Sequence, residues 1–143
     1  MPDDDAIAEE ILRRFHRVAV VGISADPNRP SHEVASYLRH VGYEVLPVNP
    51  TLSTWEGLPC SPDLAVIQPP PEVVDIFRRS EHAGAVVDEA IACGARAVWM
   101  QMGVIDAAAA DRARAAGLLV VMDRCMLVDH REMLMNEGRR TKD

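Results

Sequence analysis

Small, hydroxyl-bearing and basic residues follow the apolar segments of this chain at positions suited to phosphate binding. The segment 17–23 runs into Gly22-Ile-Ser24, where backbone amides and a hydroxyl group could surround an anion, although Gly22 also fits a tight turn. The segment 73–77 is followed by Arg78 and Arg79, directly before an expected helix. Cations are unfavourable at a helix N-terminus. We therefore expect at least one of these two guanidinium groups to pair with a bound anion.

One common phosphate-bearing ligand, NAD, is disfavoured. Its usual binding pattern is G-x-G-x-x-G, with an acidic residue at the end of the second strand. Here the first turn has the single glycine Gly22, and the second apolar segment ends in Asn49, between Pro47 and Pro50. Both parts of the NAD pattern are missing.

Cysteine and histidine residues offer two further candidates, each with a plainer alternative. Cys125 follows the last apolar segment and either forms a mixed disulfide with a thiol-bearing ligand or is a small buried hydrophobe. His32 follows the first turn and either contacts a ligand or lies at the surface. The three cysteines lack metal-ligand spacing, and no nucleophile and base stand at a recognisable catalytic spacing. We expect neither a metal site nor catalytic residues.

These candidates must be positioned by an alternation of apolar and amphipathic segments. Buried strands are predicted at 17–23, 43–49, 73–77, 95–100 and 118–122, with a short edge strand near 58–60. Helices are predicted at 6–15, 31–41, 80–93, 106–116 and 126–134, with Ser31, Ser80 and Asp106 as N-caps and one helical turn at 63–67.

This alternation predicts an α/β fold, a Rossmann-like, doubly wound, mostly parallel sheet of five or six strands with helices on both faces. Residues 1–16 would form an N-terminal helix, 17–135 the ligand-binding domain and 136–143 a flexible tail. Ligands bind outside the carboxyl ends of the strands in such sheets. The candidate positions are therefore the residues that follow each predicted strand.

Composition narrows the class of ligand. The 143 residues carry a formal net charge of −7, which argues against binding to nucleic acid or to anionic membranes. No apolar run reaches the roughly 18 residues of a membrane span, and the acidic start is unlike a secretory or transit signal, so we expect a cytoplasmic protein. A bound polyphosphate would have to be held by local amides and a few arginines.

Several strand-end motifs together resemble a known family. They are Val20-Val-Gly-Ile-Ser24, Asp26-Pro-Asn-Arg-Pro-Ser31, Gly42-Tyr-Glu-Val-Leu-Pro-Val-Asn-Pro50, Val74-Asp-Ile-Phe-Arg-Arg79, Val98-Trp-Met-Gln-Met-Gly-Val104 and Val121-Met-Asp-Arg-Cys125. In this order they resemble the stand-alone CoA-binding domain proteins, which are similar to the N-terminal domain of the succinyl-CoA synthetase α-subunit. The resemblance runs from about residue 17 to about residue 134.

The resemblance implies coenzyme A as the ligand, with its pyrophosphate at the first turn, its adenosine near Pro47 to Pro50, and the rest of the molecule along Phe77 to Arg79 and Gln101 to Gly103. Adding the other strand-end candidates, the expected contacts are Gly22, Ile23, Ser24, Arg29, His32, Pro47, Asn49, Pro50, Phe77, Arg78, Arg79, Gln101, Met102, Gly103, Arg124 and Cys125.

The chain also departs from the family pattern. Relatives carry Lys or Arg after Val-Asn-Pro, whereas Thr51-Leu-Ser-Thr54 follows here, and Arg29 could substitute in binding the ribose phosphate. The synthetase has a second domain with a phosphorylated histidine, for which this chain has no room.

The prediction is therefore a protein that binds CoA or acyl-CoA without catalysis, and that could form homo-oligomers. The alternatives are a small nucleotide-dependent enzyme (an oxidoreductase or an acyl-CoA transferase or ligase), or a CoA-sensing regulatory subunit of a CoA-dependent enzyme.

Overall fold

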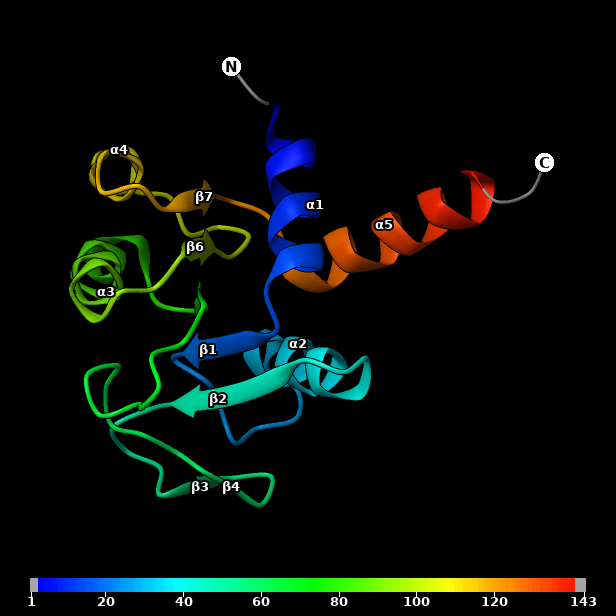
Figure 1. Cartoon of the computed structure of the whole chain (residues 1–143). Coiled ribbons are helices and arrows are strands. Elements are labelled where there is room, and N and C mark those ends of the chain that lie inside the picture. Colours follow the sequence, from blue (N-terminus) through cyan, green and yellow to red (C-terminus); the bar gives the residue numbers. More distant parts are fainter. Residues whose placement is uncertain (1–2, 141–143) are drawn as a thin grey trace.

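The strands that carry the predicted motifs form one parallel sheet. The computed structural model describes residues 3–140 and has five parallel strands in the order β2-β1-β5-β6-β7 (Figure 1). The strands are β1 (Arg17–Val21), β2 (Glu44–Val48), β5 (Val73–Ile76), β6 (Ala97–Met100) and β7 (Leu119–Val121). The predicted α/β fold with a doubly wound parallel sheet is confirmed, and the number of strands is five.

Helices cover both faces of this sheet. They are α1 (Asp4–Arg14), α2 (Pro30–His40), α3 (Ser80–Cys93), α4 (Ala107–Ala115) and α5 (Met126–Arg140). Figure 1 shows α1, α2 and α5 on one side of the strands and α3 and α4 on the other. Each layer has its own apolar core, with Ile11, Leu38 and Met126 in the first and Val87 and Ala110 in the second. The sheet separates these two cores.

The strand order reverses between β1 and β5. From β1 the chain crosses through α2 to β2 at one edge, whereas β5, α3, β6, α4 and β7 proceed toward the other edge. In doubly wound sheets such a reversal leaves a crevice at the carboxyl ends of the two strands, since the following connections diverge. The first turn after β1 and the segment after β5 border this crevice.

The residues at the helix N-termini agree with one predicted N-cap and differ from two. Asp106 caps α4 as predicted, since its Oδ1 accepts the Ala109 N–H at 3.0 Å. The N-cap of α2 is Arg29 and that of α3 is Arg79, and neither has a side-chain cap bond. Ser31 instead accepts the Ser24 N–H at 3.0 Å. The side chains of Ser31 and Ser80 form hydrogen bonds with neighbouring loops, so the prediction that they cap these helices was wrong.

The last helix is longer than predicted. Helix α5 continues to Arg140, so residues 136–140 are helical where a flexible tail was predicted, and 141–143 lie outside the described residues. The guanidinium of Arg13 in α1 binds the carboxylate of Glu137. This ion pair ties the last turns of α5 to α1, a contact between distant parts of the chain that local polarity could not reveal.

The predicted edge strand belongs to a separate hairpin. Strands β3 (Thr54–Trp55) and β4 (Leu58–Pro59) pair with each other antiparallel, outside the main sheet. Glu56 and Gly57 between them have positive φ angles of 47° and 79°, the backbone that a tight two-residue hairpin turn requires. The predicted helical turn at 63–67 is a single hydrogen-bonded turn, in which the Ile67 N–H donates to the Leu64 carbonyl at 3.1 Å.

One acidic side chain lies inside the fold. Asp75 in β5 is aligned with Val20 of β1 and Trp99 of β6, and it is 0% exposed. Neither carboxyl oxygen has a hydrogen-bond partner among the described residues. Burial raises the pKa of this carboxyl well above its usual range, because the charged form loses its hydration. The fold therefore favours the neutral, protonated form of Asp75.

Candidate functional site

A cleft of about 700 Å³ opens at the carboxyl ends of the strands, between the start of α2 and the loops after β5, β6 and β7. It lies at the reversal of strand order, as expected for this fold. The predicted site residues that line it are Gly22, Ser24, Arg29, Phe77, Arg78, Gln101, Met102 and Cys125. Lining residues that the sequence reasoning missed are Asn28, Pro30, Ser31, Glu33, Val34, Val104 and Val128.

Gly22 is required by packing within the sheet. Its φ is +87°, and a Cβ atom there would lie 2.4 Å from the Phe77 carbonyl oxygen. The Gly22 N–H donates to the Val48 carbonyl at 3.0 Å. The first turn therefore presses directly on the end of β5. No bound ligand is needed to explain a glycine at this position.

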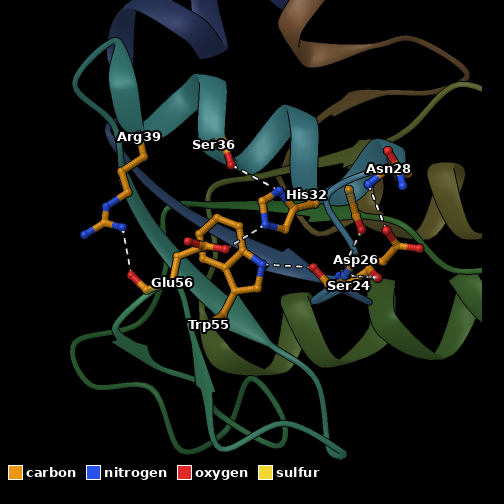
Figure 2. A network of polar contacts seen from close by, with 9 residues as sticks. Ser24, Asp26, Asn28, His32, Ser36, Arg39, Trp55 and Glu56 are labelled. Carbon is orange, nitrogen blue, oxygen red and sulfur yellow. Dashed lines mark hydrogen bonds and ion pairs between the residues drawn. The ribbon is translucent and has the colours of Figure 1, made fainter.

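The first turn is held in shape by its own hydrogen bonds. Ser24 Oγ accepts the Asp26 N–H at 3.0 Å, and Asp26 Oδ1 accepts the Asn28 N–H at 2.9 Å (Figure 2). The Ser24 carbonyl accepts the indole N–H of Trp55 at 2.9 Å. These bonds keep the loop preorganised beside α2. Of the amides that were expected to hold phosphate, that of Gly22 donates to the Val48 carbonyl and that of Ser24 to Ser31 Oγ.

The four arginines of the predicted site differ in what they contact. Arg29 and Arg78 line the cleft, and their guanidinium groups have no ion pair or hydrogen bond within residues 3–140. The Arg79 side chain is 85% exposed and lies 3.8 Å from Glu81.

Arg124 turns away from the cleft toward α1 and α5. Its Nε donates to Asp129 Oδ2 at 2.9 Å and its Nη2 to Asp5 Oδ1 at 2.7 Å. These carboxylates raise the guanidinium pKa further above its usual value. Arg124 is therefore committed to two ion pairs, whereas Arg29 and Arg78 are the predicted arginines that can meet an anion.

The predicted adenosine residues lie behind the first turn. Pro50 lines a second hollow of about 350 Å³, which also includes Gly22 and Arg78. Asn49 does not face either hollow but donates from Nδ2 to the Ile23 carbonyl at 2.7 Å. Ile23 and Pro47 are buried. These three residues support the turn, and Pro50 is the one that borders open space.

His32 points to the hairpin, not to the cleft. Its Nε2 lies 2.9 Å from Glu56 Oε1, and its Nδ1 lies 3.3 Å from Ser36 Oγ (Figure 2). The imidazole also packs against the Trp55 indole, with ring centroids 5.1 Å apart. The hairpin therefore braces the start of α2 and the first turn, a role that the sequence reasoning did not assign to Trp55 or Glu56.

The far end of the cleft is formed by the loops after β6 and β7. Gln101 is 5% exposed, and its Oε1 accepts the first N–H of α5, from Met126, at 3.3 Å. Gly103 does not line the cleft, and its N–H donates to Asp123 Oδ1 at 2.7 Å. Cys125 lines the cleft as a free, partly buried thiol.

Comparison with known proteins identifies the family. The model of the CoA-binding domain family matches residues 16–131, most of the chain. The chain belongs to the CoA-binding domain family. The chain is 38% identical over 122 residues to the uncharacterized protein YneT of Bacillus subtilis (strain 168), and the match covers 85% of this chain and 90% of YneT.

Solved structures show the same fold. A hypothetical protein from Pyrococcus horikoshii OT3 has 37% identity and a TM-score of 0.88, covering 94% of this chain and 96% of that one. An acetyl-coenzyme A synthetase of Ca. Korarchaeum cryptofilum has a TM-score of 0.70 at 23% identity, and the match covers 80% of this chain but 27% of the synthetase. The synthetase likeness concerns the fold alone.

Residues 3–140 contain no group of three or more His, Cys, Asp or Glu side chains that could hold a metal ion. Within the same residues, no helix is both long and apolar enough to cross a membrane. What the cleft does offer is a preformed loop, a helix N-terminus and two unpaired guanidinium groups, which are means of binding an anion.

Proposed function

We propose that this protein binds coenzyme A in the cleft at the carboxyl edge of the sheet and catalyses no reaction on its own. The observation that carries the proposal is the pair Arg29 and Arg78, which line the cleft with guanidinium groups that have no partner within residues 3–140. In a chain of net charge −7, two such guanidinium groups beside a helix N-terminus favour a polyanionic ligand.

The same surroundings support the diphosphate of CoA as that anion. Helix α2 starts at Pro30, and the described residues provide no acceptor for the following Ser31 N–H, which can donate to a phosphate oxygen. The adenosine then lies toward the hollow that includes Pro50, and the pantetheine arm crosses the ends of β5 and β6. Arg78 borders both hollows, so it can contact the diphosphate between them.

The surroundings of Cys125 support binding without catalysis. The acidic and basic side chains next to it in the sequence are already engaged. Asp129 pairs with Arg124, and His130 Nδ1 lies 2.7 Å from the Tyr37 hydroxyl. Asp129 and His130 each border another hollow than the cleft that Cys125 lines, so neither is placed to serve this thiol as a base.

Isothermal titration calorimetry with CoA tests the proposal. Arg29→Ala and Arg78→Ala are each expected to weaken CoA binding about tenfold, because each removes a charge-assisted bond to phosphate. Arg79→Ala is the matched control, since Arg79 faces solvent beside Glu81 and its loss should change the affinity less than about twofold. Gly22 is unsuitable for substitution, because any Cβ there strikes the Phe77 carbonyl.

Ligand fragments localise the contacts. The affinity for ADP should fall when either arginine is replaced, and the affinity for pantetheine should not change. Comparison of dephospho-CoA with CoA measures how much the ribose phosphate contributes to the affinity. A protein that binds NAD but not CoA at millimolar concentration contradicts the proposal. So does a CoA affinity that neither arginine substitution changes.

A further inference from the structure

Large apolar side chains are exposed at one end of the cleft. Met102 is 66% exposed and Val128 is 43% exposed, and both line the cleft together with Val104 and Cys125. The opposite end of the same cleft carries Ser24, Asn28, Arg29 and Ser31. Apolar groups left in water within a concave site mark a surface that a ligand or partner covers.

The loop that presents Met102 is fixed rather than loose. The Val104 N–H donates to the Gln101 carbonyl at 2.8 Å, and Gly103 has a φ of +88°, as in a type II turn with Met102 at the corner. Asp123 Oδ1 accepts the Gly103 N–H at 2.7 Å. On the other side, Ser80 Oγ accepts the Ile105 N–H at 2.9 Å. Neighbouring side chains therefore hold an exposed methionine in a defined place.

The order of the strands separates the two ends of the cleft. The polar end follows β1, and the apolar end follows β6 and β7, which are two and three strands away across the sheet. At about 4.8 Å between strands, the distance from β1 to β7 is about 14 Å. A pantetheine arm has the length of about four extended residues, also about 14 Å. With the diphosphate at β1, the sulfur of CoA therefore reaches the ends of β6 and β7.

We infer that the preferred ligand is an acyl-CoA with an aliphatic chain, and that the chain lies on the apolar end formed by Met102, Val104 and Val128. This inference rests on the proposed CoA site. Methionine suits the role because its unbranched, polarisable side chain adapts to chains of different length. The thioester then lies near Cys125, and no covalent step is involved.

Calorimetric titration with CoA, acetyl-CoA, butyryl-CoA and hexanoyl-CoA tests the inference. Affinity should rise about twofold for each added methylene, since full burial of a methylene gives about fourfold and an open cleft covers about half of it. Met102→Ser and Val128→Ser should flatten this series, so that hexanoyl-CoA binds each variant no more than about twofold tighter than free CoA does. Met135→Ser is the matched control, because Met135 is 59% exposed on α5 but does not line the cleft.

The outcomes separate the two proposals. If CoA binds and the affinity does not depend on chain length, the acyl-chain inference is wrong and the proposed function stands. If CoA itself does not bind, the proposed function fails and the inference falls with it. If Met102→Ser and Val128→Ser instead turn a dimer into a monomer in sedimentation and leave the series unchanged, the apolar end is a contact between copies of the chain, and the inference is again overturned.

Discussion

Replacing Asp75 with asparagine is expected to stabilise the protein, and more so as the pH rises. The Asp75 carboxyl is fully buried in β5 without a hydrogen-bond partner in the described part of the chain, and burial raises its pKa well above the usual range. The folded protein thus retains a proton that the unfolded chain releases. Folding stability must then fall as the pH rises above the unfolded-state pKa.

The size of the effect follows from this one proton. Above the pKa of an aspartate in an unfolded chain, about 3.9, the free energy of unfolding falls by about 1.4 kcal/mol for each pH unit. The fall ends where the pH reaches the folded-state pKa of Asp75. Asparagine has nearly the same shape as aspartic acid and does not ionise. The unfolding free energy of Asp75→Asn therefore lacks this dependence on pH. For a domain of this size, 1.4 kcal/mol corresponds to about 3 to 6 °C in Tm.

Urea denaturation at about pH 5 and about pH 6 measures the difference. The gap in unfolding free energy between Asp75→Asn and the unchanged protein should widen by about 1.4 kcal/mol between the two pH values. Asp111→Asn is the control, because the Asp111 side chain is 80% exposed. The difference in unfolding free energy between Asp111→Asn and the unchanged protein should be the same at both pH values. Equal gaps for Asp75→Asn at both pH values would refute the reasoning, since they would mean that Asp75 is ionised in the fold.

Two further predictions concern the polar end of the cleft. Trp55→Phe removes the indole N–H that binds the Ser24 carbonyl, so it should cost about 1 to 2 kcal/mol of stability and weaken ADP binding several-fold in calorimetry. Trp99→Phe removes the equivalent bond to the Arg124 carbonyl at the other end and should leave ADP binding unchanged. Glu33→Gln removes a carboxylate from the cleft lining and should tighten CoA binding about two- to fivefold at low salt, and unchanged affinity would place the phosphates away from α2.

The sequence predicted the sheet well because its strands are buried on both faces. Continuous apolar runs such as 18–21 and 97–100 are typical of parallel strands that helices cover on both faces. The positions of the strand ends followed from these runs, and with them much of the cleft lining. Strand order also mattered for the site, and it depends on contacts between distant segments that no local pattern contains.

Side-chain direction at the strand ends could not be predicted. Arg124 and His32 stand at suitable positions in the sequence, yet each is turned away from the cleft by a partner from a distant segment, Asp5 for Arg124 and Glu56 for His32. The hairpin that supplies Glu56 was missed because its turn lacks the usual asparagine or aspartate before glycine. A glutamate with positive φ is uncommon, so the sequence carried no signal for this turn.

The two tryptophans provide an intrinsic fluorescent probe at each end of the cleft. Trp55 is bonded to the loop after β1, and Trp99 is bonded to the loop after β7, and both indoles are buried. Indole emission responds to changes in hydrogen bonding and in local polarity. With one indole replaced by phenylalanine, the fluorescence of the other reports on a single loop. Occupancy of the two ends of the cleft can then be followed separately, in solution and without an attached dye.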